Sequence, residues 1–149
     1  MTGSVLLDTN LLVYAYDRSD LRKQRLALEL LRALAGRRRG AVSTQVLGEF
    51  LVTITRKPLE PLPLEAALRE VDRHLQTWQV LDVTSEVVRE AVRGVRDHRL
   101  NYWDAQIWAV ARLNRIPMVL SEDFSDGAVL EGVRFLNPLR ADYSPASRL

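Results

Sequence analysis

The chain of 149 residues contains no cysteine, which excludes a disulfide framework, a thiolate metal site and a thiol nucleophile. It also lacks an apolar run long enough to span a membrane, and its N-terminus lacks the basic and then apolar layout of a signal peptide. We therefore expect a cytoplasmic protein without a membrane anchor. The length and the hydrophobic content of 47% suit one domain with a single core.

Lysine is almost absent, since it occurs only at positions 23 and 57, and arginine supplies nearly all of the positive charge. Arginine suits bidentate contacts with phosphate. A compositional bias toward arginine explains most of these positions equally well, and the formal net charge is only +2. The charge of the chain therefore does not identify a nucleic-acid-binding protein by itself.

Short apolar runs alternate along the chain with longer segments of helical periodicity. Strands are predicted at Val5–Leu7, 41–42, 80–83, Met118–Leu120 and Val133–Leu136. Helices are predicted at 21–35, with Gly36 as the cap that ends it, and at 44–56, 64–78, 85–96 and 102–114. This alternation is typical of βα units and predicts a parallel sheet with helices on either side.

Asp8 stands directly after the first predicted strand, in the sequence SVLLDTNLLVYAY. The run Val5–Leu7 has no polar alternation, which suits a strand buried on both faces. Open α/β sheets bind ligands at the ends of such strands. Asp8, Thr9 or Asn10 could equally cap the following helix, so for Asp8 alone a structural and a functional interpretation both stay open.

Asp104 lies in the first turn of the predicted helix 102–114. At 100° per residue, the apolar arc of this helix includes Trp103, Ile107 and Ala111, and Asp104 falls between Ala111 and Trp108. An acid next to an Asn101 cap is common at a helix start. The cap does not explain why this acid faces inward, so we expect it to have a second role.

Two further acids have weaker individual signals. Glu49 borders the apolar stripe of the predicted helix 44–56, where a solvated glutamate is the commoner case. Asp123 follows the predicted strand Met118–Leu120 in the sequence VLSEDF, where an acid is usually a turn former. Each of these two acids becomes informative only in combination with Asp8 and Asp104.

Together these acids predict a metal site, because parallel strands bring their carboxyl ends to one edge of the sheet. Carboxylates that converge there repel one another unless a cation is bound. Hard oxygen ligands without histidine or cysteine select Mg²⁺ or Mn²⁺. We therefore interpret Asp8 as a metal ligand.

The ordered segments VLLDTNLLVYAY, STQVLGEF, NYWDAQIWAVA and VLSEDF resemble the PIN-domain nucleases, and most closely the VapC-like toxins of prokaryotic toxin–antitoxin pairs. The resemblance extends over residues 5–138. It implies an α/β fold, a three-layer α/β/α sandwich with a central parallel sheet of about four to five strands. The domain would occupy residues 1–138, followed by a flexible tail at 139–149. The implied activity is Mg²⁺- or Mn²⁺-dependent cleavage of RNA, with an antitoxin partner and a homodimer.

The resemblance also assigns roles to individual residues. The catalytic and metal-binding acids would be Asp8, Glu49, Asp104 and Asp123, although Glu122 beside Asp123 could face the metal instead. Thr9, Asn10 and Ser121 would position the carboxylates or the scissile phosphate. The basic residues predicted to contact the RNA backbone are Arg96 and Arg99, with Arg56 and Lys57 as further candidates.

Two other functions fit parts of the sequence. A phosphotransfer α/β protein also places an aspartate after a strand. Its phosphatase variant needs a second aspartate where this chain has Asn10, and no lysine follows Lys57 to serve a later strand end. A non-catalytic PIN-fold module that binds RNA or protein is the other alternative, against which the complete set of acids argues.

Overall fold

The computed structural model of the protein describes residues 3–140. The strands are β1 (Val5–Leu7), β2 (Gly40–Ser43), β3 (Gln79–Leu81), β4 (Met118–Leu120), β5 (Val129–Leu130) and β6 (Val133–Leu136). The helices are α1 (Thr9–Tyr14), α2 (Leu21–Gly36), α3 (Thr44–Ile54), α4 (Leu64–Thr77), α5 (Ser85–His98) and α6 (Tyr102–Leu113). The predicted alternation of strands and helices is therefore confirmed.

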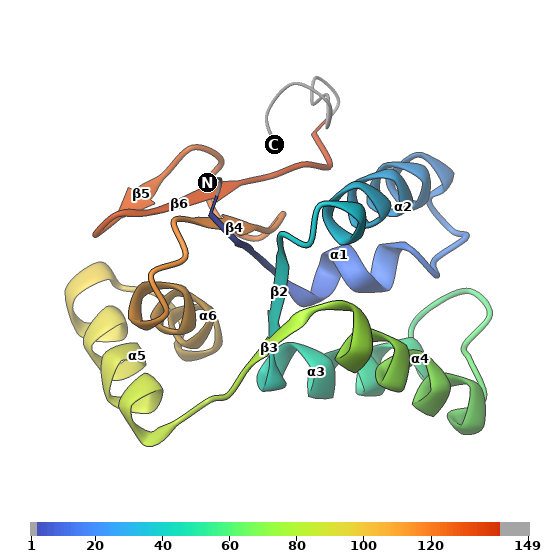
Figure 1. Cartoon of the computed structure of the whole chain (residues 1–149), viewed down its shortest axis with the longest axis horizontal. Helices are drawn as coiled ribbons and strands as arrows, with labels where there is room; N and C mark the ends of the chain where they lie inside the picture. Colours follow the sequence, from blue (N-terminus) through green and yellow to red (C-terminus); the bar gives the residue numbers. More distant parts are fainter. Residues whose placement is uncertain (1–2, 141–149) are drawn as a thin grey trace.

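The strands form one sheet in the order β3-β2-β1-β4-β6-β5. β1 is central, pairs in parallel with β2 and β4, and consists of three fully buried aliphatic residues. Helices α1 to α4 lie on one side of the sheet, and α5 and α6 lie on the other (Figure 1). This is the expected three-layer sandwich. The order of strands reverses at β1, and α/β sheets bind ligands at such a switch point.

The sheet differs from the prediction at one edge. The two-residue strand β5 runs antiparallel to β6, so the sheet has six strands and is not wholly parallel. A strand of two residues carries too little periodicity to be recognised in a sequence. Glu131 and Gly132 form the turn between β5 and β6, both with positive φ (49° and 85°).

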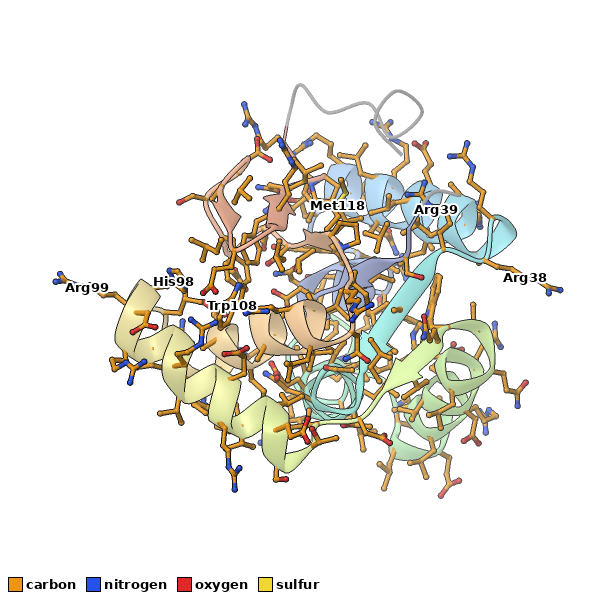
Figure 2. All side chains as sticks on the ribbon, turned by 60° about the vertical axis from the view of Figure 1, so that its left-hand side comes forward. Arg38, Arg39, His98, Arg99, Trp108 and Met118 are labelled. Carbon is orange, nitrogen blue, oxygen red and sulfur yellow. The ribbon has the colours of Figure 1, made fainter. Side chains whose placement is uncertain are left out.

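The predicted cap at Gly36 is wrong, because α2 includes Gly36 and its C-cap residue is Arg37. Arg38 adopts the left-handed conformation instead, with φ of 53°. The amides of Arg38 and Arg39 donate to the carbonyls of Ala35 and Leu34, which satisfies the end of the helix. The Arg38 side chain extends into solvent (Figure 2).

The residues directly after β6 pack against the rest of the domain. Pro138 and Leu139 are buried, and the Leu139 carbonyl accepts a hydrogen bond from the Arg22 guanidinium at 2.8 Å. These contacts anchor the chain after β6 against α2. The remainder of the predicted tail, residues 141–149, lies outside the described residues. Within residues 3–140, no helix is long and apolar enough to cross a membrane.

The close packing of α5 on α6 depends on Gly94. Trp108 of α6 is completely buried, and it lies beside His98, with the two rings in an edge contact at 5.3 Å (Figure 2). A Cβ at position 94 would come within 2.8 Å of the Trp108 ring. The absence of a side chain at Gly94 therefore lets α5 approach α6, which carries Asp104 at its start.

Candidate active site at the carboxyl edge of the sheet

Asp8 caps α1 and also faces the next strand of the sheet. Its Oδ1 accepts a hydrogen bond from the Thr9 amide at 2.7 Å, and its Oδ2 accepts one from the Ser121 hydroxyl at 2.6 Å. Ser121 follows β4 and is separated from Asp8 by 113 positions in the chain. The cap that the sequence suggested is thus present, but it occupies only one of the two carboxylate oxygens.

The environment of Asp8 disfavours its ionised form. The side chain is only 4% exposed, and this burial is the main cause that raises its pKa from 3.8 to about 7. The hydrogen bonds from Ser121 and Thr9 lower the pKa, whereas the charges of Asp123 and Glu49 raise it. Asp8 is therefore a buried acid whose ionised form is opposed by both desolvation and like-charge repulsion.

Asp104 lies in the first turn of α6, where Asn101 caps the helix by accepting from the Asp104 amide. The Asn101 side chain also donates to Asp104 Oδ2 at 2.6 Å. Partial burial raises the pKa of Asp104, the bond from Asn101 lowers it, and the charge of Asp123 raises it further. Asp104 is thus both part of a capping arrangement and electrostatically coupled to Asp123.

The predicted burial of Trp103 is wrong. Its side chain is 63% exposed, and its ring contacts the edge of Tyr102. Ile107, Val110 and Ala111 are buried as predicted. The first turn of α6, which carries Trp103, extends to the polar carboxyl edge of the sheet, where the apolar core ends.

A chain of hydrogen bonds that the sequence pattern did not predict holds Glu49. The Tyr102 hydroxyl donates to Gln106 at 2.7 Å, and the Gln106 amide donates to Gln45 Oε1 at 2.7 Å. The Gln45 amide then donates to Glu49 at 2.6 Å and to the Trp103 carbonyl at 3.3 Å. Gln106 is buried, and a buried amide on an otherwise apolar helix is the sequence signal that could have indicated this link.

Glu122 and Asp123 face different partners. The Glu122 carboxylate accepts from Lys23 Nζ at 2.9 Å and from the Tyr14 hydroxyl at 2.6 Å. The Asp123 carboxylate accepts from the Asn10 amide at 3.1 Å. Because the charge of Asp123 also acts on Asp8 and Asp104, Asp123 is the member of this pair that shares an electrostatic environment with the other acids.

The structure thus brings the four predicted acids, Asp8, Glu49, Asp104 and Asp123, to the same edge of the sheet as an electrostatically linked acid cluster. Within residues 3–140, no three acidic, histidine or cysteine side chains are close enough together to ligate one ion. The donor set nevertheless suits a hard cation, because all of its ligating atoms are oxygens. Beside it, Thr9 Oγ1 and Asn10 Oδ1 are buried and have no hydrogen-bond partner in the described part of the chain.

The four predicted basic residues have different surroundings. Arg96 pairs with Asp97 at 2.8 Å, and Arg99 is the left-handed C-cap of α5, from which its side chain extends into solvent (Figure 2). Arg56 is exposed after the end of α3. Lys57 lines a cavity that also contains Asp123, so among these four it is the residue with a direct structural link to the acid cluster.

Comparisons with known proteins agree with this architecture. The sequence profile of the PIN domain family matches residues 5–125. A comparison with curated protein sequences finds no match. A toxin–antitoxin complex from Klebsiella pneumoniae is similar in structure, with a TM-score of 0.67 and 22% identity, covering 91% of this chain and 98% of that chain.

Two further solved structures have the same fold. VapC20 from Mycobacterium tuberculosis, a toxin that cleaves the sarcin-ricin loop, has a TM-score of 0.65 and 22% identity, covering 86% of this chain and 98% of its own. A DNA-bound VapBC from Salmonella typhimurium has a TM-score of 0.62 and 17% identity, covering 90% and 97% of the two chains. At these identities the likeness concerns the fold.

Proposed function

This chain belongs to the PIN domain family, and on that premise we propose that it is a metal-dependent ribonuclease, the toxin of a toxin–antitoxin pair. The observation that carries the proposal is the acid cluster at the switch point of the sheet. A protein gains no stability from a buried Asp8 whose pKa is raised by burial and by neighbouring acids. Such an arrangement is expected where charge serves a function.

The acids that would hold Mg²⁺ or Mn²⁺ are Asp8 and Asp104, with Asp123 as a further ligand and Glu49 as a ligand or an acceptor for a bound water. When bound, such an ion polarises a phosphoryl oxygen and lowers the pKa of a coordinated water. The oxygen-only donor set and the two unpartnered oxygens of Thr9 and Asn10 support this assignment.

The residues around the acids would keep them oriented during the hydrolysis of a phosphodiester. Ser121 holds Asp8 through the 2.6 Å hydrogen bond and accepts from the Asp123 amide at 3.0 Å, so it links two of the acids. Asn10 holds Asp123, and Asn101 holds Asp104. Gln45 orients Glu49. Each acid therefore has a partner that limits its rotation before substrate arrives.

The toxin assignment rests on the solved structures of similar fold, which include a toxin–antitoxin complex and an RNA-cleaving toxin. We propose that this chain likewise binds a small antitoxin protein and forms a homodimer. An antitoxin segment with a cationic side chain, arginine above all, would complement the acid cluster. The site of action would be the cytoplasm, where both RNA and the antitoxin are made.

The test is incubation of the purified protein with total cellular RNA, with Mg²⁺ or Mn²⁺ and with EDTA, followed by mapping of the cleaved ends. We expect metal-dependent cleavage by the wild type and none by Asp8→Asn or Asp104→Asn. Asp72→Asn is the matched control, because Asp72 is an exposed acid on α4. Wild-type rates in both site variants would remove the nuclease assignment.

A non-catalytic PIN-fold module remains the second candidate, because no three acids of residues 3–140 lie within ligation distance of one ion. The two candidates differ in cells. Expression of the wild type without a partner should slow growth if the protein is a toxin, and Asp8→Asn should relieve this effect. RNA binding without cleavage, together with equal growth of the two strains, would favour the module.

A further inference from the structure

A cavity of about 340 Å³ adjoins the acid cluster between α1 and the end of α3. One wall is a face of α1 that includes Asn10 and Tyr14, and the other is formed by Thr53 and Lys57. Asp123 closes the end nearest the acids. The volume falls within the range of about 300 to 1,000 Å³ that is typical of small-molecule sites, so the cavity can receive a group as large as one nucleotide.

Lys57 brings an uncommitted cation to this cavity. Its side chain is exposed, and within residues 3–140 it has no ion pair or hydrogen bond. The chain contains only two lysines, and the other, Lys23, lies behind the same cavity, where it pairs with Glu122 and lies over the Tyr14 ring at 4.9 Å. An ammonium group without a partner beside a polar cavity is suited to a phosphate.

Tyr14 contributes an aromatic wall whose position is fixed. Its hydroxyl donates to Glu122 at 2.6 Å and accepts from Lys23 at 3.3 Å, and the residue is part of the cavity lining. Single-stranded RNA is commonly bound by stacking of its unpaired bases on such rings. The nucleotide's phosphate needs a cation, and Lys57 in the same lining supplies one. The cavity thus combines the two kinds of contact that one nucleotide needs.

We propose that this cavity is a nucleotide subsite of the enzyme, in which Tyr14 contacts the base and Lys57 contacts the phosphate next to the one that is cleaved. The inference rests on the proposed ribonuclease function and names the part of the site that determines where the RNA strand lies. Thr9 and Asn10 also line the cavity and complete its polar side next to Asp123.

Two acids in the lining limit where the phosphate can lie. Asp123 belongs to the acid cluster, and Asp17 at the far end accepts hydrogen bonds from the amide and hydroxyl of Ser19 at 2.9 and 2.6 Å. Both repel a phosphate, so the phosphate is confined to the side of Lys57. The base, which is neutral and carries donor groups on its edges, can lie between the acids and the ring.

The test measures binding and cleavage separately. Binding of a single-stranded RNA oligonucleotide is measured as a function of salt in the presence of EDTA, where no cleavage occurs, for the wild type, Lys57→Gln and Lys57→Arg. Loss of one phosphate contact should reduce the slope of log K against log salt by about 0.7 in Lys57→Gln and leave it unchanged in Lys57→Arg. Arg32→Gln, an exposed arginine on α2, is the control for net charge.

The ring is tested by Tyr14→Leu and Tyr14→Phe. Loss of the stacking surface should weaken RNA binding by about tenfold in Tyr14→Leu. Tyr14→Phe keeps the ring and loses only the hydroxyl's bonds to Glu122 and Lys23, so it should bind RNA nearly as well as the wild type. Circular dichroism of each variant identifies any that fails to fold. If Tyr14→Leu fails to fold, the salt slopes of the Lys57 variants still test the subsite through its phosphate contact.

The outcomes distinguish this inference from the proposed function. If the wild type cleaves RNA but Lys57→Gln and Arg32→Gln have the same salt slope and Tyr14→Leu binds normally, the subsite is refuted and the ribonuclease assignment stands. The cavity would then be left for a protein segment. If the wild type binds RNA with these dependences and never cleaves it, the proposed function fails while the nucleotide subsite is supported.

Discussion

Replacement of Asp8 by asparagine should stabilise the metal-free protein, although it removes a helix cap carboxylate. The pKa of Asp8 rises from 3.8 in the unfolded chain to about 7 in the folded one, mainly through burial. This difference corresponds to about 4 kcal/mol of unfolding free energy, as an upper limit. Asparagine resembles the protonated acid in size, can still accept from the Thr9 amide, and can donate to the Ser121 hydroxyl.

The direction of the pH dependence follows from linkage. Folding favours the protonated form of Asp8, so its stabilising contribution is complete below pH 3.8 and is lost as the pH rises through about 7. The unfolding free energy of Asp8→Asn should therefore equal that of the wild type near pH 4 and exceed it by up to about 4 kcal/mol at pH 8. Urea titrations at several pH values in EDTA measure this difference.

Metal should narrow the difference in stability between the two proteins. At a hundredfold excess over its dissociation constant, Mn²⁺ should stabilise the wild type by about 2.7 kcal/mol, and Asp8→Asn should gain less because it lacks one ligand charge. An ordinary cap behaves differently, since its loss costs about 1 kcal/mol at any metal concentration. If Asp8→Asn is less stable than the wild type at pH 8 in EDTA and metal changes neither protein, the repulsion of the acids and the metal site are refuted.

Three further outcomes test other parts of the structure. Burial lowers the pKa of His74 from 6.5 to about 4, so the unfolding free energy should fall by about 3 kcal/mol as the pH drops from 6.5 to 4. His74→Gln should flatten this pH dependence, which urea titrations at several pH values measure. Gly94→Ala should lower the melting temperature because its Cβ meets the Trp108 ring, while Gly48→Ala in α3, where no atom lies within 4 Å of the new Cβ, should raise it through about 1 kcal/mol of helix propensity. Gln106→Leu should reduce the cleavage rate constant by about tenfold without changing the affinity for RNA in EDTA. The reason is that it removes the hydrogen bond to Gln45, the residue that orients Glu49. An unchanged rate constant would refute a role for this hydrogen-bond chain in catalysis.

The local sequence was sufficient to predict the strands and most helix starts. β1, β4 and β6 have the predicted bounds, and Asn101 caps α6 as expected, as Ser43 and Thr84 cap α3 and α5 through their own side chains. These features depend on neighbours within a few positions, such as a side-chain oxygen and the amide three residues later. The wrong cap at Gly36 and the missed strand β5 have the same cause, because the local pattern there consisted of one glycine or of two strand residues.

The arrangement of the acid cluster was decided by contacts between distant segments. The sequence indicated that Asp8, Glu49, Asp104 and Asp123 would share one edge of the sheet, because parallel strands end together. It could not indicate that Asp8 accepts a hydrogen bond from Ser121. Nor could it indicate that Glu122 accepts from Lys23 and Tyr14, whereas Asp123 accepts from Asn10. Those choices depend on which partner each side chain meets after folding.

The residues around the acids likewise include features that the sequence predicted and features that only the folded structure shows. Helical periodicity placed Trp103 in the apolar arc of α6, but the structure leaves it exposed, because a periodic pattern records the direction of a side chain and not where the core ends. The link from Gln106 through Gln45 to Glu49 joins α6 to α3, and the cavity lined by Tyr14 and Lys57 lies between α1 and the end of α3. Short-range hydrogen bonds and the burial pattern in the sequence specify each helix. The neighbours of that helix are determined by the packing of the whole sheet, which brings together residues far apart in the chain.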